Sequence, residues 1–367
     1  MKKQIKYYDL LIKNKFIQKI LFVCFDIILF SIRFFASKIP LKKKSVCVIS
    51  IHKLGDSVFT FDAINSIKKF YDEEIFIICN VDSVPIYEFI HNKNLIIPIP
   101  KNYFHFGDRY LDRKARKILS SLKPKIIIDL TGVMTSASLI FNSRAENIIG
   151  FNRRIFKGIY NNFSEFQLGK HSREIYTNAL KKNIPISEFN ETIESPINSD
   201  RILIAPFAGW TSKEWSLIKF IELAKLLSKN LNVCIIFDNR KISKEILYYL
   251  QEEKINIIKT ESIADLINEI KNCKLLIGND SGPVQIAALL GKYTFSIYGP
   301  TNPDFHLPRG KKHFFIQKKL PCSPNKDERL CFTDGGKNGC PSFECMNQLD
   351  VEKVHKKVLK IFNEINL

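Results

Sequence analysis

Residues 46–70, VCVISIHKLGDSVFTFDAINSIKKF, carry the pattern that decides the fold class. The run 46–51 is apolar apart from one serine, which is typical of a parallel strand covered on both faces. Gly55 allows a tight turn after that strand, and residues 56–70 have the apolar spacing of a helix. A strand followed at once by a helix predicts the βα unit of an α/β protein.

The same alternation continues along the chain in two series. Ile- and Val-rich runs alternate with helical patterns before residue 185 and again after residue 200, which predicts two Rossmann-like domains. Open parallel sheets bind ligands beyond the carboxyl ends of their strands, so we expect the domains to face a central cleft. The further expected strands are 75–79, 95–99, 126–130, 202–205, 233–237, 255–258, 275–277 and 294–297, and the further expected helices are 109–122, 217–227, 243–252, 263–273, 282–290 and 351–365.

The two series are separated by residues 185–200, PISEFNETIESPINSD. This stretch is polar, contains two prolines and has no periodicity, so it is predicted to be a linker. The expected organisation is a basic amphipathic helix at 1–44, an N-terminal domain at 45–184, a C-terminal domain at 201–320, and a Cys-rich segment with a terminal helix at 321–367.

The composition excludes several classes of protein. The chain has 367 residues, 45% of them hydrophobic, which is too apolar for a disordered or fibrous chain. Its net charge of +19 suits nucleic acid, an anionic membrane or a phosphorylated substrate. No recognition helix and no platform of aromatic and basic residues is evident in the sequence, so we do not expect a nucleic-acid partner.

Much of the positive charge lies in the first 44 residues, which hold eleven Lys and Arg but only two acidic residues. Within them, residues 16–36, FIQKILFVCFDIILFSIRFFA, are apolar except for one stripe formed by Lys19, Asp26 and Arg33, seven residues apart. This pattern predicts a helix lying in the plane of a membrane interface. A membrane-spanning anchor and a helix packed against the globular body are the alternatives. Charges interrupt the apolar run, which disfavours a secretory signal peptide.

The nine cysteines form two groups. Five are scattered in apolar contexts typical of core thiols, which indicates a reducing compartment. The other four have the spacing C-x8-C-x8-C-x4-C, without the C-x2-C pair of a strong zinc site. We therefore expect no metal, with zinc in this cluster as the alternative. The four clustered residues are Cys322, Cys331, Cys340 and Cys345.

Polar residues with chemical potential follow several expected strands. Asp56 stands at the expected start of a helix, where it is either a helix cap or a general base for an incoming hydroxyl. Residues 278–283, GNDSGP, form a turn before another helix, whose backbone N–H groups suit an anion. Lys213 follows the first strand of the second series and could neutralise a leaving phosphate. A capped turn and a surface lysine are the alternatives for these last two.

Taken together, these segments resemble glycosyltransferase family 9, the ADP-heptose:lipopolysaccharide heptosyltransferases with the GT-B fold. The similarity extends from about residue 45 to the C-terminus. The segments that carry it are KLGDSVFTFDAINSIKKF at 53–70, IIIDLTGVMTSASLIFNSRAENIIGFNRR at 126–154, LIAPFAGWTSKEWSLIKFIELAKLL at 203–227, GNDSGPVQIAALLGKYTFSIYGPTNP at 278–303 and the Cys-rich stretch 320–354.

The resemblance implies an acceptor-side N-terminal domain, a donor-binding C-terminal domain and an inverting, metal-independent transfer without a cofactor. By it, Asp56 matches the catalytic base and Lys213 the lysine that contacts the donor phosphates. The implied substrates are a nucleotide-sugar, ADP-heptose, and an anionic lipopolysaccharide or lipooligosaccharide acceptor. The implied location is the cytoplasmic face of the inner membrane, with peripheral attachment. The expected donor-binding residues are Asp280, Ser281, Gly282, Gly299, Pro300 and Thr301, and the expected acceptor-binding residues are Lys53, Arg144, Arg153 and Arg154.

The sequence departs from the family pattern beside the expected donor site. Gln285 stands where a histidine is usual, and Phe207 and Ser216 replace a usual glycine and a usual proline. Two alternatives therefore stay open. One is a GT-B glycosyltransferase with another nucleotide-sugar donor or a polysaccharide acceptor. The other is an inactive, membrane-attached binder of sugar nucleotides.

Overall fold

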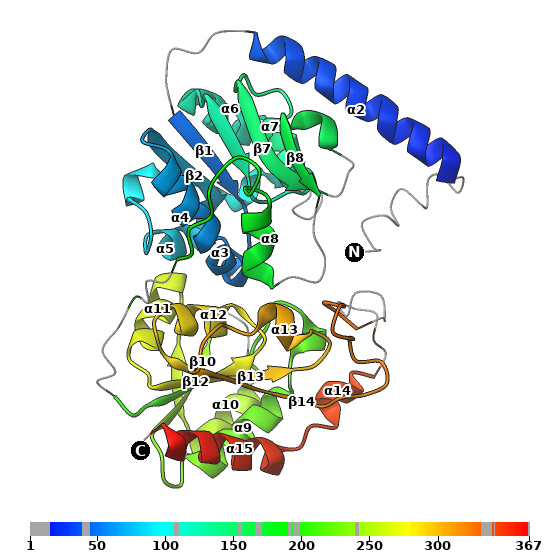
Figure 1. The fold of residues 1–367 in the computed structure, drawn as a ribbon. Coiled ribbons are helices and arrows are strands. Elements are labelled where there is room, and N and C mark those ends of the chain that lie inside the picture. The colour runs from blue at the N-terminus through cyan, green and yellow to red at the C-terminus, as the bar shows by residue number, and fades with distance from the viewer. Residues whose placement is uncertain are drawn as a thin grey trace. The chain divides into compact units, whose positions relative to one another are not determined.

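The computed structural model describes residues 15–38, 45–105, 110–152, 156–165, 171–189, 193, 199–238, 242–331, 340 and 342–365. The chain divides into two compact units between residues 190 and 191, inside the stretch expected to be a linker. Each unit contains one parallel six-stranded sheet, and the elements of both are labelled in Figure 1.

The first unit holds a sheet with strand order β3-β2-β1-β6-β7-β8. All neighbouring strands in it are parallel, which is the Rossmann-like arrangement predicted from the sequence. The strands are β1 (Ser45–Ser50), β2 (Glu74–Asn80), β3 (Ile96–Ile99), β6 (Ile126–Asp129), β7 (Asn147–Asn152) and β8 (Asn162–Glu165), with a separate antiparallel pair β4 (Phe104–His105) and β5 (Tyr110–Leu111). The helices are α2 (Lys15–Ser37), α3 (Leu54–Phe59), α4 (Phe61–Phe70), α5 (Val84–Tyr87), α6 (Arg113–Leu122), α7 (Met134–Ile140) and α8 (Ser172–Asn178).

The second unit repeats this topology, with strand order β11-β10-β9-β12-β13-β14 and parallel neighbours throughout. Helices α11 and α12 lie on one side of its sheet and helices α9, α10 and α15 on the other (Figure 1). The strands are β9 (Ile202–Ala205), β10 (Val233–Phe237), β11 (Asn256–Lys259), β12 (Leu275–Asn279), β13 (Tyr293–Tyr298) and β14 (His313–Gln317). The helices are α9 (Leu217–Leu227), α10 (Lys244–Glu252), α11 (Ile263–Lys271), α12 (Gly282–Leu289), α13 (Pro303–His306), α14 (Glu344–Asn347) and α15 (Val351–Glu364).

The prediction of a single helix at 56–70 is wrong, because the structure has two helices there, α3 and α4. Thr60 interrupts it, because its hydroxyl donates a hydrogen bond of 2.7 Å to the carbonyl oxygen of Ser57 and occupies an acceptor that a continuous helix would use. Strands β7, β8 and β14 are also present although the sequence analysis did not anticipate them. Polar residues and a glycine interrupt β7 and β8, so neither shows the continuous apolar run of a central strand.

The C-terminal segment completes the core of the second unit. The fully buried indole of Trp215 donates from its N–H to the carbonyl oxygen of Leu349 at 2.9 Å and packs edge-on against Phe220 of α9. Apolar residues of α15, including Val354 and Val358, are fully buried in the same cluster. The Cys-rich end of the chain is therefore built into this unit.

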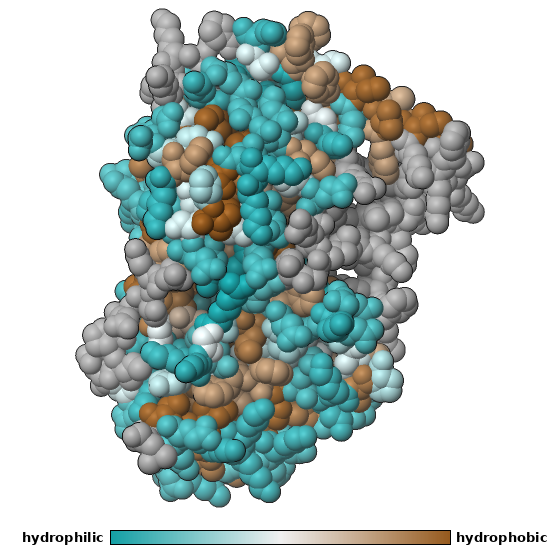
Figure 2. Space-filling view, viewed as in Figure 1, coloured by the Kyte–Doolittle hydropathy of each residue, from teal (hydrophilic) through white to brown (hydrophobic). Residues whose placement is uncertain are grey.

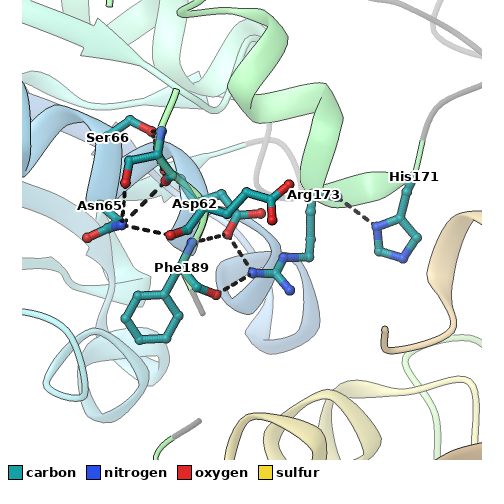
Figure 3. A network of polar contacts seen from close by, with 8 residues as sticks. Asp62, Asn65, Ser66, His171, Arg173 and Phe189 are labelled. Atoms are coloured by element: carbon teal, nitrogen blue, oxygen red, sulfur yellow. Dashed lines mark hydrogen bonds and ion pairs between the residues drawn. The ribbon is translucent and has the colours of Figure 1, made fainter. Parts of the chain in front are cut away.

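A buried ion pair fastens the end of the first unit to its body (Figure 3). The Arg173 guanidinium lies 2.5 Å from an Asp62 carboxylate oxygen, and the Asp62 side chain is only 5% exposed. The same oxygen accepts the backbone N–H of Phe189 at 2.7 Å, and the Phe189 carbonyl accepts a second bond from Arg173. Helices α4 and α8 thus hold Phe189, in the first part of the stretch predicted to be the linker.

We expect Arg173→Ala to destabilise the first unit by about 3–5 kcal/mol, because it leaves the Asp62 carboxylate buried without its cation. Chemical denaturation of the purified protein measures the change. The matched control is Lys125→Ala, which removes an exposed partner of Glu146 and should cost less than about 1 kcal/mol. Equal effects of the two substitutions would contradict the structural role of the pair.

Candidate active site

In the first unit, the candidate base Asp56 lies just beyond the carboxyl end of β1. Helix α3 begins at Leu54, with Lys53 as its N-cap residue, so Asp56 is in the first turn rather than at the cap position. A carboxylate there is stabilised by the positive end of the helix dipole. Asp56 is half-buried and Lys53 is exposed.

His52, which the sequence analysis did not single out, is close to Asp56. Its Nε2 lies 3.0 Å from the carbonyl oxygen of Leu130, and its ring packs edge-on against Tyr176 at 5.0 Å. Burial lowers the pKa of His52, and the Asp56 charge and the Leu130 carbonyl oppose this only in part. His52 is therefore neutral at physiological pH. The one feature of the sequence that could have identified His52 is its position directly after the first strand.

Asp129 anchors the neighbouring loop of the same edge. It is fully buried, accepts the backbone N–H groups of Thr131 and Gly132, and accepts the Tyr160 hydroxyl at 2.6 Å. Burial raises its pKa although these hydrogen bonds act in the other direction. The Thr131 hydroxyl in turn accepts the N–H of Ile51 at 2.9 Å. Asp129 thus couples the loop after β6 to the loop that carries Asp56.

Of the two expected acceptor-binding residues that lie in the described part of the chain, Lys53 stands near Asp56 and Arg144 does not. Arg144 is exposed and precedes β7, so it lies toward the amino edge of the sheet, whereas Lys53 and Asp56 follow β1 at the carboxyl edge. The structure therefore brings Lys53 but not Arg144 to the candidate base. Arg153 and Arg154 lie outside the described residues.

In the second unit, Lys213 and Asp280 meet at the carboxyl ends of the adjacent strands β9 and β12. The Lys213 ammonium lies 2.6 Å from an Asp280 carboxylate oxygen and 4.6 Å from the centre of the Trp210 ring. Both side chains are largely buried, 14% and 7% exposed. The same carboxylate oxygen accepts the hydroxyl of Thr301, which follows β13, at 2.8 Å. Three neighbouring strands therefore contribute to one cluster.

The Asp280 carboxyl stays ionised within this cluster. Burial by itself would raise its pKa, but the charges of Lys213 and His306 and the hydrogen bonds from Lys213 and Thr301 outweigh burial and lower it. A lysine has three N–H donors, and Asp280 accepts from it through its carboxylate and, at 3.4 Å, through its backbone carbonyl. Within the described part of the chain the third N–H donor has no further partner and is available to a ligand.

Two buried hydroxyl groups lie near this pair. Among the described residues, Ser281 Oγ and the Tyr298 hydroxyl are buried without a hydrogen-bond partner, a rare condition that a bound ligand relieves. Burial raises the pKa of Tyr298 well above its ordinary value, and the nearby Asp280 charge adds to this. Ser281 is also the N-cap residue of α12, and its side chain makes no capping bond. Helix α12 begins at Gly282 and presents its positive end here.

Gln285, at the position where the family pattern has a histidine, is buried and donates to the carbonyl oxygen of His306 at 2.7 Å. This bond ties α12 to the end of α13. His306 is near enough to lower the pKa of Asp280, so an imidazole approaches the cluster from a different element. The sequence analysis did not anticipate His306, because only the fold brings residues 280 and 306 together.

The turn at residues 299–301 also has a structural role. A side chain at Gly299 would collide with the Met346 sulfur at 2.5 Å and crowd Cys345, and the carbonyl of Pro300 accepts the N–H of Cys331 at 2.8 Å. The Gln317 amide donates to the carbonyl oxygens of Gly299 and Thr301. Of the three expected donor-site residues in this turn, only Thr301 has its side chain on the Lys213–Asp280 cluster.

The four clustered cysteines come together behind this turn. Burial raises the pKa of the Cys345 thiol to about 11, and the neighbouring thiols of Cys331, Cys340 and Cys322 contribute to the shift. The backbone N–H of Phe343 donates to Cys340 Sγ at 3.3 Å. Across the described residues, no group of three or more His, Cys, Asp or Glu side chains has the arrangement of a metal site.

Comparison with known families identifies this architecture. The model of glycosyltransferase family 9 (heptosyltransferase) matches residues 113–333, more than half of the chain. The chain belongs to glycosyltransferase family 9. Its resemblance to that family, first seen in short motifs, is thereby confirmed.

Relatives and solved structures agree with the family assignment. Lipooligosaccharide heptosyltransferase 2 of Campylobacter jejuni serotype O:6 is 26% identical over 328 residues, which are 84% of this chain and 96% of that protein. The E. coli ADP-heptose lps heptosyltransferase II structure has a TM-score of 0.67 at 18% identity and covers 88% of this chain and 100% of its own. The E. coli heptosyltransferase WaaC structure with ADP has a TM-score of 0.63 at 14% identity. It covers 86% of this chain and 99% of its own. These structures confirm the predicted GT-B fold.

We expect Lys213→Met to destabilise the protein by about 3–5 kcal/mol at neutral pH, because Asp280 is then buried without its cation. In the wild type the pKa of Asp280 is lowered, so its stabilising charge is complete above the unfolded value of about 3.9 and is lost as pH falls through the folded pKa. In the variant unopposed burial raises that pKa. Urea denaturation at a series of pH values measures the free energy of unfolding of both proteins. The difference between wild type and Lys213→Met should become smaller as the pH is lowered.

The matched control for this measurement is Lys225→Met, which removes the partner of Glu253 in an ion pair whose lysine is 46% exposed. Its effect should be small over the same pH range, because solvent screens an exposed ion pair. A Lys213→Met difference that does not depend on pH would contradict the electrostatic coupling to Asp280.

Proposed function

We propose that this protein is an inverting glycosyltransferase that moves a heptose from ADP-heptose to a lipopolysaccharide or lipooligosaccharide core acceptor without a metal cofactor. Family membership supports glycosyl transfer. The heptose and the acceptor class come from the names of the relatives, such as the Campylobacter jejuni lipooligosaccharide heptosyltransferase 2. The adenosine diphosphate carrier comes from solved family members described with ADP or as acting with ADP-heptose.

The observation that carries the proposal is the Lys213–Asp280 cluster beneath the start of α12. A nucleotide-sugar presents a diphosphate and several sugar hydroxyls. The cluster offers an ammonium with a remaining donor, an ionised carboxylate that accepts from hydroxyls, and the unpartnered hydroxyls of Ser281 and Tyr298. The N-terminus of α12 adds a positive helix dipole, which favours phosphate.

In the proposed reaction, the Asp56 carboxylate accepts the proton of an acceptor sugar hydroxyl as that oxygen bonds to the anomeric carbon. The bond from this carbon to the diphosphate breaks on the opposite side, so the anomeric configuration inverts. The leaving ADP carries away the bonding electrons. Asp56 suits the base because it stands in the first turn of α3, directly beyond the carboxyl end of β1, where it is half-buried.

Negative charge builds on the diphosphate as the bond breaks. Lys213 and the start of α12 stabilise this charge, and such groups fixed in advance make a large contribution to catalysis. Because Asp280 holds the ammonium in a buried position, Lys213 needs little rearrangement when the charge develops. This supply of positive charge is the reason why the proposal requires no metal.

We expect Asp56→Asn to reduce transfer by about 10²–10⁴-fold, the usual contribution of a general base. Donor binding should be nearly unchanged, because the donor groups belong to the other unit. Initial rates and calorimetric donor binding measure the two effects. The control is Asp82→Asn, an exposed carboxylate of the same unit that pairs with Lys101. Turnover by Asp56→Asn at the wild-type rate would refute the role of the base.

A donor screen tests the identity of the sugar. Purified protein is offered ADP-heptose or common nucleotide-hexoses together with truncated lipopolysaccharide, and products are weighed by mass spectrometry. We expect the mass of the acceptor to increase by one heptose with ADP-heptose and to stay unchanged with the nucleotide-hexoses. Because Gln285 stands where the family pattern has a histidine, another donor is the alternative, and addition of a hexose from it would assign the enzyme to that donor. Turnover with none of the donors would favour the inactive binder.

A further inference from the structure

Helix α2 is attached to the first unit by its polar side, which is the reverse of an ordinary surface helix. Arg33 is 4% exposed and donates from its guanidinium to the carbonyl oxygens of Ser143 and, at 2.7 Å, Ala145. Burial lowers its pKa to about 10, so it remains charged at neutral pH. Leu29, one turn earlier on the same side, is also buried.

A second attachment lies one helical turn further toward the N-terminus. The Asp26 carboxylate accepts the backbone N–H of Gly158 at 3.1 Å, and Phe25 packs edge-on against Phe156. Gly158 has no room for a side chain, because a Cβ atom there would overlap the Asp26 backbone. The helix and the short 3-10 helix η4 (Lys157–Ile159) are therefore in close backbone contact. Two residues of the charged stripe predicted from the sequence, Asp26 and Arg33, thus bind backbone groups of the first unit.

Apart from these attachments, the described residues leave the rest of the α2 surface apolar and exposed. At 3.6 residues per turn, the exposed residues between Ile17 and Phe35 span an arc of about 220°, and this arc contains no charged residue. Ile27, Phe30 and Phe35 are 60%, 61% and 71% exposed. In Figure 2 the part of this helix that is not grey is strongly hydrophobic. A soluble protein does not leave such a patch in water without a partner.

We propose that this outward arc of α2 is inserted into the interface of an anionic lipid bilayer, with the helix axis in the membrane plane and the first unit held on the membrane surface through Arg33 and Asp26. The inference goes beyond the proposed function and does not depend on it. Lys38 is exposed at the end of the helix, and further lysines flank the helix in sequence at residues 2–15 and 42–44. Each contributes about 1 kcal/mol of attraction to an anionic surface.

The geometry favours a bilayer over the other possible occupants. A partner helix from a second copy covers a seam much narrower than this arc, whereas lipid covers all of it. A spanning orientation is disfavoured, although α2 is long and apolar enough to cross a membrane. Spanning would pull Arg33 and Asp26 from their protein partners into hydrocarbon, where charged side chains are costly.

Vesicle binding of the full chain tests the proposal. We expect Ile27→Glu to reduce partition into vesicles of phosphatidylethanolamine and phosphatidylglycerol by about ten-fold or more, since a large apolar side chain is lost from the interface. The matched control is Ile218→Glu on α9, because Ile218 is 59% exposed and should leave partition unchanged. Equal losses, no loss, or a loss explained by the disappearance of a dimer in solution would overturn the proposal. A transfer assay with a deacylated, water-soluble acceptor measures glycosyl transfer without a membrane. It therefore tests the proposed function independently of vesicle binding.

A second measurement tests the in-plane orientation. Ile27, near the middle of α2, and Phe34, near its end, lie on the same outward side about 10 Å apart along the axis, and each is replaced by Trp in a separate variant. Quenching of the introduced tryptophan by lipids brominated at one chain position reports its depth. We expect the two variants to be quenched equally. A marked difference in depth between them would show a spanning helix and overturn the proposal.

Discussion

Parallel strands all end at the same edge of their sheet, and this constraint governs where chemistry can occur in the protein. The strands β1 and β12 are buried along their whole length, so functional side chains can only stand in the loops that follow them. Asp56 follows β1, whereas Lys213, Asp280 and Thr301 follow β9, β12 and β13. The sheets therefore act as rigid supports, and the short loops at their carboxyl edges carry the functional groups.

Charge compensation in buried positions is the second theme of the structure. Asp62 with Arg173 and Asp280 with Lys213 are ion pairs whose carboxylates are almost inaccessible. Such pairs contribute little net stability but are costly to break, so they fix one arrangement of the elements that carry them. In the first unit the pair fixes the chain end leading to the linker. In the second it keeps an ammonium ready beside the start of α12.

Helix α2 follows the same rule with an unusual outcome. Its charged residues pair with backbone groups of the first unit, and its apolar residues face outward. An amphipathic pattern read from a sequence usually places the apolar side against the protein. Here Arg33 donates to backbone carbonyl groups and Asp26 accepts a backbone N–H of the first unit, while the hydrophobic residues face outward.

The sequence by itself determined both α/β halves, most central strands, the amphipathic helix and the residues Asp56, Lys213 and Asp280, because periodicity and local turn motifs are encoded in neighbouring residues. Only the tertiary structure decided what depends on distant contacts. It paired Lys213 with Asp280, joined Thr301 to this pair, and added His52 and His306 to the candidate sites. It also placed Arg144 toward the opposite edge of the sheet from Asp56. It also chose the side of α2 that meets the protein. Such choices arise from long-range packing and desolvation, which no local pattern records.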